Sequence, residues 1–490
     1  MPKRPFSRLS LKNRRRLLHN TPEDYAYLYY GIFFLCSVLY IILAMVSEGD
    51  TVRYSLFYAP SFDYRKSTDL FMDFFNSVRD ASHGGGYEKN VIYPPLANLI
   101  YVAIGQMFKS ELVGLEFSGR FQLRDYDPIA LMVYFLCIML CVFSVYLILD
   151  RYLLRSKFKA APAALALSSA LSFPMLYAIQ RGNIIILAIP LTMFFVFFRN
   201  HERKLVRELS YIALALAAGI KIYPAVFGIL LITDKKYKEA LRLVLYGVVA
   251  FVVPVFAFGG PELLLRLFEN IAGFNASHDA ATVTLRSGYS FQELIAVMAP
   301  SGFWSVGGKV LFWILEIVAL VLVFVLPKDW QKITALCYLI FNIRSLSSMY
   351  ALAFFLVPFA MFLTDKRKFR WNDYLYLISL ALMFIPLPCL WYGYLDEMVK
   401  HSGLLAGFTG TSLDLARWKL IAHYGGVNKL LSAFAFQEMF LLLVIDALLT
   451  PTQNGKKRKL SLKNLVAWGK SLFKKNRSEE SLEPVTEENV

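Results

Sequence analysis

Apolar runs alternate with short polar segments along most of the chain. Several runs approach or exceed the about 20 residues that a helix needs to cross a bilayer. They lie near residues 25–46, 92–108, 129–149, 160–178, 184–198, 209–232, 241–258, 309–326, 332–343, 346–363, 374–391 and 430–449. The pattern predicts an all-α polytopic membrane protein.

The basic segments between the runs orient the predicted spans. If every run crossed once, the basic segments 150–159 and 199–208 would lie outside with the long loop 47–91, against the preference of Lys and Arg for the cytoplasmic side. Both violations disappear under one change. The run 92–108 then lies on the outer face as a juxtamembrane helix, and the run 209–232 breaks into two short crossings.

The expected break lies at Lys221, an isolated cation in an apolar stretch, because the nearby Pro224 removes a helix hydrogen bond. This topology has about 12 transmembrane helices and places both termini in the cytoplasm of a multi-pass cell-membrane protein. The expected outer segments are 47–91, 109–128, 259–308 and 392–429. Acidic residues outnumber basic ones in the first three, and the fourth has three acidic and four basic residues.

The predicted organisation has four parts. A basic cytoplasmic tail (1–24) precedes a transmembrane module (25–235) that contains the first outer loop (47–128). A second transmembrane module (236–450) follows. Residues 451–490 are expected to form a cytoplasmic tail with an amphipathic helix and an acidic, disordered end.

Composition and charge agree with a membrane protein. Hydrophobic residues make up 57% of the chain and charged residues 18%, where a soluble protein carries about 25% charged residues. The formal net charge is +16, but the most basic stretches flank membrane spans, so anionic lipid is the expected partner and nucleic acid is not. The five Cys lie in apolar runs without metal-ligand spacing and are interpreted as small core residues.

Acidic side chains of the first outer loop are the first candidates for chemistry. Asp69 and Asp73 are four residues apart, so on a helix they share a face, with the neighbouring Phe side chains turned to the bilayer. A carboxylate held beside water can act as a general base on a sugar hydroxyl. The alternative interpretation is helix capping and solvation, which two acids alone do not exclude.

Cations near the predicted spans are the second group of candidates. Arg181 and Asn183 lie in a predicted tight outer turn around a glycine. Lys221 needs an anion, because an unpaired buried cation costs several kcal/mol; the anion is either a carboxylate of the fold or a ligand phosphate. Arg344, also on the predicted outer side, is a third cation.

An acid and two or three cations suit a transferase whose donor is a lipid-linked phosphate. The cations would hold the leaving phosphate, and the acid would deprotonate the attacking hydroxyl. A non-catalytic transporter or flippase for lipid-linked sugars would also need outward cations and broken helices. The two hypotheses differ in whether the carboxylate is essential. The sequence contains no P-loop, dinucleotide-binding fingerprint, zinc-protease or serine-hydrolase motif.

Four short motifs follow one another within roughly residues 60–235: Asp73-Phe-Phe, Tyr93-Pro-Pro-Leu96, Arg181-Gly-Asn183 and Lys221-Ile-Tyr-Pro224. In order and spacing they resemble the GT-C superfamily of membrane glycosyltransferases. The resemblance is closest to its bacterial polyprenol-phosphate-mannose-dependent α-mannosyltransferases. The third and fourth motifs also resemble the eukaryotic enzyme that adds the first mannose to GPI-anchor precursors.

The resemblance implies an outward-facing active site, a polyprenyl-phosphate donor of a hexose such as mannose, an inverting displacement and no metal. The acceptor would be an extracytoplasmic lipid-linked or cell-envelope glycan. Asp73 matches the family's Asp-aromatic-aromatic context and takes the role of base, with Asp69 second. The residues expected to bind substrate are Tyr93, Arg181, Asn183, Lys221, Tyr223 and Arg344. Where many bacterial relatives carry a late histidine-containing outer turn, this chain has Arg-Ser-Leu-Ser-Ser-Met-Tyr at 344–350, which leaves the sugar and the acceptor open.

Overall fold

The computed structural model describes residues 29–39, 71–82, 87, 91–108, 128–153, 160–280, 303–342, 349–365, 370–385 and 432–449. Within these ranges every regular element is a helix. Both predicted tails, the predicted outer loop 392–429 and the candidate residues Asp69 and Arg344 lie outside the described residues.

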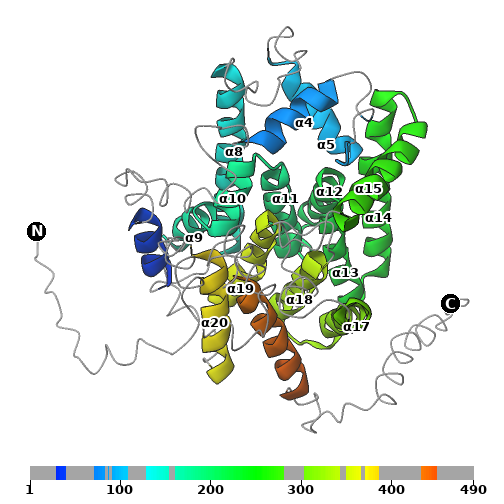
Figure 1. Ribbon diagram of the computed structural model, residues 1–490. Helices are drawn as coiled ribbons and strands as arrows, with labels where there is room; N and C mark the ends of the chain where they lie inside the picture. The colour runs from blue at the N-terminus through cyan, green and yellow to red at the C-terminus, as the bar shows by residue number, and fades with distance from the viewer. Residues whose placement is uncertain are drawn as a thin grey trace, which may run out of the picture.

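The helices pack side by side, with α4 and α5 together at one end of the molecule and α20 toward the other (Figure 1). Two of them, Tyr29–Leu39 and Ser432–Leu449, are named by their residues. The α-helices labelled in Figure 1 are α4 (Met72–Ser82), α5 (Pro95–Gly105), α8 (Pro128–Tyr152), α9 (Ala161–Ala170), α10 (Phe173–Arg181), α11 (Ile185–Phe198), α12 (Lys204–Ile220), α13 (Ile229–Thr233), α14 (Tyr237–Val252), α15 (Glu262–Ala280), α17 (Phe303–Val325), α18 (Asp329–Asn342), α19 (Leu356–Leu363) and α20 (Trp371–Phe384). The 3-10 helices are η2 (Tyr223–Gly228), η3 (Val253–Phe258) and η4 (Met349–Phe355).

Three of the described helices are long and apolar enough to cross a membrane: α8, the segment Tyr237–Phe258 that joins α14 to η3, and Ser432–Leu449. The bent pair of α9 and α10 adds a fourth if it crosses as one span. Large apolar side chains such as Met132 of α8 and Leu241 of α14 are exposed, as expected of helix faces that contact lipid. These helices indicate a membrane protein, while the full set of about 12 crossings stays a prediction.

The break at Lys221 is confirmed. Helix α12 ends at Ile220, Lys221 has an extended backbone (φ −141°, ψ 128°), and the 3-10 helix η2 begins at Tyr223. Pro224 lies in the first turn of η2, where it lacks the N–H that would continue the α-helical hydrogen bonds. The helix is therefore interrupted at the only cation of this apolar run.

The run 160–178 forms two helices where one was expected. Helices α9 and α10 are bent by 56° relative to each other. Ser172 between them is extended (φ −67°, ψ 148°), and Pro174 lies in the first turn of α10, where its missing N–H costs nothing. The two halves can therefore point in different directions without losing a hydrogen bond at the proline.

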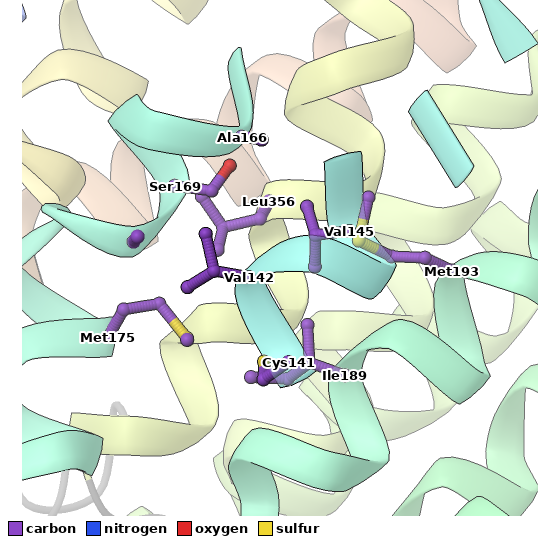
Figure 2. A pocket seen from close by; sticks show the side chains of 10 residues that line it. Cys141, Val142, Val145, Ala166, Ser169, Met175, Ile189, Met193 and Leu356 are labelled. Carbon is purple, nitrogen blue, oxygen red and sulfur yellow. The ribbon is translucent and has the colours of Figure 1, made fainter. Parts of the chain in front are cut away.

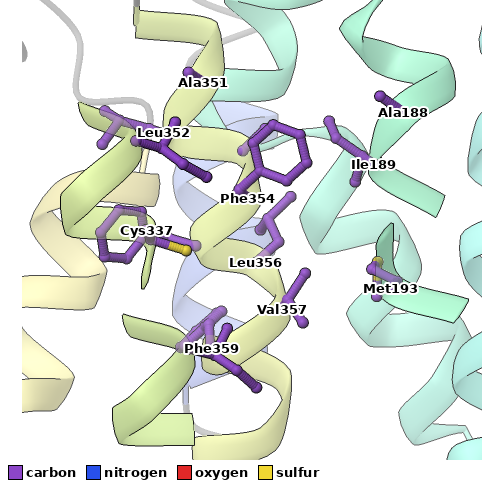
Figure 3. Packing of buried hydrophobic residues seen from close by; sticks show 14 of the residues in the cluster. Ala188, Ile189, Met193, Cys337, Ala351, Leu352, Phe354, Leu356, Val357 and Phe359 are labelled. Atoms are coloured by element: carbon purple, nitrogen blue, oxygen red, sulfur yellow. The ribbon is translucent and has the colours of Figure 1, made fainter. Parts of the chain in front are cut away.

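The core surrounds α11, which is apolar on all sides and packs against α8, α12 and η4. Ile189 and Met193 of α11 face Phe354 and Leu356 at the junction of η4 and α19 (Figure 3). Cys337 of α18 is fully buried in the same core, which agrees with its interpretation as a small core residue.

Polar side chains gather at both ends of α11. Just beyond its C-terminal end, Arg199 is almost fully buried and pairs with Asp234 at 3.0 Å and with Asp329 at 2.5 Å. Arg199 and Asp234 lie in the segments 199–208 and 233–240, which the predicted topology places together on the cytoplasmic side. At the other end, about 20 Å away by the rise of a helix of this length, lies Asn183.

Candidate active site

Asp73, Arg181 and Asn183 meet in one polar cluster, although 108 and 110 residues separate Asp73 from the other two. Arg181 Nη2 donates a hydrogen bond to Asp73 Oδ1 over 2.8 Å, and Asn183 Nδ2 donates to Asp73 Oδ2 over 3.0 Å. The side chains of Asp73 and Arg181 are 14% and 22% exposed. Both carboxylate oxygens are therefore engaged in a site that is largely shielded from water.

Helix α4 holds Asp73 in its first turn, where the helix dipole favours a negative charge. The next two side chains, Phe74 and Phe75, are buried, and their rings pack against Tyr134 of α8 with centroids 4.9 and 6.3 Å away. The expectation that these Phe side chains face the bilayer is wrong. Helix α4 packs against α5 and α10, its aromatic rings contact Tyr134, and this aromatic face is part of the protein core.

Gly182 allows the turn after α10 to reach the start of α4. It caps α10 with a left-handed backbone (φ 71°, ψ 30°), a conformation that glycine adopts without steric cost. A Cβ at this position would lie 2.7 Å from the carbonyl oxygen of Phe71, which directly precedes α4. The tight turn expected from the sequence thus also provides the close approach that brings Arg181 and Asn183 to Asp73.

The Asn183 side chain is held in one orientation. It is 1% exposed, and its Oδ1 accepts a hydrogen bond from the backbone N–H of Ile185 over 3.1 Å. Since the oxygen faces this donor, the amide nitrogen faces Asp73, and it also lies 3.5 Å from the Tyr93 hydroxyl. Asn183, which is expected to bind substrate, directly contacts the carboxylate.

Lys221 lies on the other side of Tyr93. Its Nζ is 4.2 Å from the centre of the Tyr93 ring and 5.6 Å from the centre of the Tyr350 ring, as in cation–π contacts. Among the described residues no carboxylate lies within 4.0 Å of Lys221 Nζ, and Asp73 acts on it electrostatically from farther away. The lysine therefore keeps its capacity to bind an anion.

Tyr93 connects the lysine to the carboxylate side of the site. Burial raises the pKa of its phenol well above the usual range, and nearby Tyr101 and Asp73 add to the rise. The phenol is therefore neutral, with its ring toward Lys221 and its hydroxyl toward Asn183. We call Asp73, Tyr93, Arg181, Asn183 and Lys221 the Asp73 cluster.

Of the remaining candidates, only Tyr223 lies in the described part of the chain. It is a core residue whose ring meets Phe354 edge to face, with centroids 5.7 Å apart. Its hydroxyl is buried and has no hydrogen-bond partner among the described residues. The structure thus brings Asp73, Arg181, Asn183, Tyr93 and Lys221 together and places Tyr223 in the adjoining core.

Two further tyrosines adjoin the cluster and were not assigned from the sequence. Tyr350 contacts Lys221, and its ring stacks on that of Tyr177 with centroids 6.1 Å apart and an interplanar angle of 18°. Tyr177 lies four residues before Arg181 on α10, which places both on one helix face. The four-residue spacing of Tyr177 and Arg181 can be recognised in the sequence, whereas no sequence pattern connects Tyr350 with these two residues.

An apolar hollow between α8, α9, α10, α11 and α19 is a second feature of the fold (Figure 2). Its described lining includes Val145, Met175 and Ile189, and one polar side chain, Ser169, which donates its hydroxyl to the Leu165 carbonyl oxygen over 2.7 Å. The described lining therefore offers no acid, base or cation, and the Asp73 cluster is the better candidate for chemistry.

Counted over the described residues, the Asp73 cluster contains two cations and one carboxylate, which leaves one positive charge. A ligand with one negative charge would neutralise it. When a second anion binds nearby and pairs with the two cations, the carboxylate is suited to accept a proton from a hydroxyl. The arrangement can therefore combine anion binding with general-base chemistry.

Comparison with known proteins gives one match. The sequence model of glycosyltransferase family 87 matches residues 92–343, just over half of the chain. No curated protein and no solved structure matches the chain. The matched range contains Tyr93, Arg181, Asn183 and Lys221 and begins after Asp73.

Proposed function

The chain belongs to glycosyltransferase family 87, and from this premise we propose that it transfers a hexose from a polyprenyl-phosphate donor to an extracytoplasmic acceptor. Mannose is the first candidate for the hexose, because the sequence motifs resemble polyprenol-phosphate-mannose-dependent enzymes. The acceptor in this proposal is a lipid-linked or cell-envelope glycan. Asp73 is the general base.

The observation that carries the proposal is the contact of Asp73 with Arg181 and Asn183 beside Lys221. Asp73 and Arg181 form an ion pair at 2.8 Å, and Lys221 lies against Tyr93, whose hydroxyl is within reach of Asn183. A sugar phosphate bound by the two cations would bring its anomeric carbon next to a carboxylate. Positioning of this kind is a main source of rate enhancement in transfer reactions.

In the proposed reaction the acceptor hydroxyl oxygen forms a bond to the anomeric carbon as the bond from that carbon to the phosphate oxygen breaks. The hydroxyl proton passes to Asp73, and the bonding electrons remain on the polyprenyl phosphate. Negative charge thus moves from the carboxylate to the leaving phosphate, where Arg181 and Lys221 stabilise it. The net charge of the site is the same before and after transfer.

A monophosphate donor suits this charge count. The phosphodiester of a polyprenyl-phosphate sugar carries one negative charge, which together with Asp73 balances Arg181 and Lys221. A diphosphate donor would add a further negative charge without a further described cation. The lipid chain also fits an enzyme with lipid-facing helices, because donor and enzyme then share the bilayer.

The proposal is tested with the purified full-length protein in lipid vesicles. Radiolabelled polyprenyl-phosphate mannose and glucose, and the corresponding nucleotide sugars, are offered with a glycolipid extract of cells that lack the gene. We expect label from one polyprenyl-phosphate sugar to enter one glycolipid, identified by a mass increase of one hexose. Transfer from nucleotide sugars alone would contradict the donor assignment, and movement of lipid-linked sugar across the vesicle without transfer would favour the transporter hypothesis.

A further inference from the structure

Asp73 is held by two partners of different kinds. Asn183 is fixed, because its amide is buried and its oxygen is bound to the backbone N–H of Ile185. Arg181 has a long side chain at the end of α10 and is 22% exposed. One carboxylate oxygen therefore has a rigid donor and the other has a donor that is able to move.

The ion pair with Arg181 opposes the role of Asp73 as a base. A cation in contact with a carboxylate stabilises its charged form and so disfavours uptake of a proton. The same cation would favour the reaction if it contacted the phosphate, where the negative charge arises. The resting contact at 2.8 Å is therefore favourable before the donor binds and unfavourable during transfer.

We propose that Arg181 exchanges partners, leaving Asp73 Oδ1 for the donor phosphate when the donor binds, while Asn183 keeps Asp73 Oδ2 in place. This inference rests on the proposed function and deepens it. Donor binding would then free one carboxylate oxygen for the acceptor hydroxyl. The base would become fully active only when a donor is present, which would favour binding of the donor before the acceptor.

Partner exchange has a measurable cost, because the donor must break the ion pair of Asp73 with Arg181. Asp73→Asn removes this cost, so the variant should bind undecaprenyl phosphate about tenfold more tightly than the natural protein. Loss of a negative charge alone would also improve binding of an anion. The two causes are separated by repeating the substitution in a protein with Arg181→Gln.

The experiment is a double-mutant cycle of dissociation constants for undecaprenyl phosphate in detergent micelles, with undecaprenol as the uncharged control. If Arg181 exchanges partners, the gain from Asp73→Asn falls below about twofold in the Arg181→Gln background. An equal gain in both backgrounds would overturn the exchange. Arg181→Lys serves as a second background in case the glutamine variant does not fold.

Failure of the proposed function would look different. If the natural protein bound undecaprenyl phosphate no better than undecaprenol, the donor assignment would fail and the exchange with it. If it bound the phosphate and transferred sugar while the cycle was additive, only the exchange would be refuted. Asp80→Asn, on the same helix but paired with Arg79 outside the cluster, should leave the dissociation constant unchanged.

Discussion

At the residue scale, the sequence left two interpretations of Lys221: an internal ion pair with a carboxylate of the fold, or a binding site for a ligand phosphate. An internal ion pair would have shown a carboxylate against its Nζ. Instead the described neighbours are the rings of Tyr93 and Tyr350, at 4.2 and 5.6 Å to their centres. Aromatic faces attract the cation without neutralising it, so this environment favours the ligand interpretation.

Replacing Lys221 by Met, which retains the packing of the chain stem against the two rings, should raise the KM for the polyprenyl-phosphate donor about 10- to 100-fold. A charge-assisted hydrogen bond to a phosphate is worth about 1.5–3 kcal/mol. The KM for the acceptor should change little. Steady-state kinetics with each substrate varied in turn gives the answer, with Lys238→Met on the exposed face of α14 as the control.

An unchanged donor KM in the Lys221 variant, together with a lower melting temperature, would mean that the lysine only stabilises the fold. Arginine at this position should restore part of the donor affinity because it keeps the charge.

The sequence indicated the charged residues of the candidate site and Tyr93, but not the two other tyrosines beside them. Asp73, Arg181 and Lys221 were recognisable because a charge near a predicted span needs a reason. The stacking of Tyr177 on Tyr350 joins positions that no local sequence pattern connects. The role of Asn183 was expected to be substrate binding, and its contact with Asp73 depends on the fold of a turn that the sequence specified only in outline.

At the element scale, two prolines had similar effects and only one was anticipated. Pro224 begins η2 next to a charged residue, and the distribution of basic loops independently required a break there. Pro174 begins α10 within an uninterrupted apolar run, where hydrophobicity alone gives no sign of the 56° bend. Breaks are therefore predictable where charge and topology coincide with the proline.

The placement of α4 and α5 also shows what the hydrophobic pattern alone does not specify. Helix α5 has 11 residues, about 17 Å of length, which is too short to cross the hydrocarbon layer. The juxtamembrane position expected for 92–108 stays a prediction. Helix α4 was expected to turn its Phe side chains to lipid, but it packs them inward against Tyr134. Periodicity indicates which face is apolar and not whether lipid or protein covers it.

At the scale of the whole molecule, the arrangement separates two polar ends. The Asp73 cluster lies at one end of α11 and the ion cluster of Arg199 at the other. The first contains part of the predicted outer loop, and the second joins predicted cytoplasmic segments. The side of the membrane on which each end lies is a prediction of the charge pattern.

This topology is testable by labelling single cysteines on intact cells with a membrane-impermeant maleimide, in a protein whose five native cysteines are replaced. Met107→Cys, at the exposed end of α5, should react from outside. Lys204→Cys, at the exposed start of α12, should react only after permeabilisation, because the basic segment 199–208 belongs inside. The reverse pattern would invert the orientation of the protein.

The most direct measurement of the central claim is the turnover of Asp73→Asn compared with Asp80→Asn, two substitutions of the same kind on the same helix. Asp73 contacts Arg181 and Asn183 in the candidate site, whereas Asp80 pairs with Arg79 outside it. Loss of a general base should reduce kcat by at least about 100-fold in the first variant, with the melting temperature retained and undecaprenyl phosphate bound at least as tightly as by the natural protein, and should leave the second near normal. Near-normal transfer by a folded Asp73→Asn protein would contradict the account.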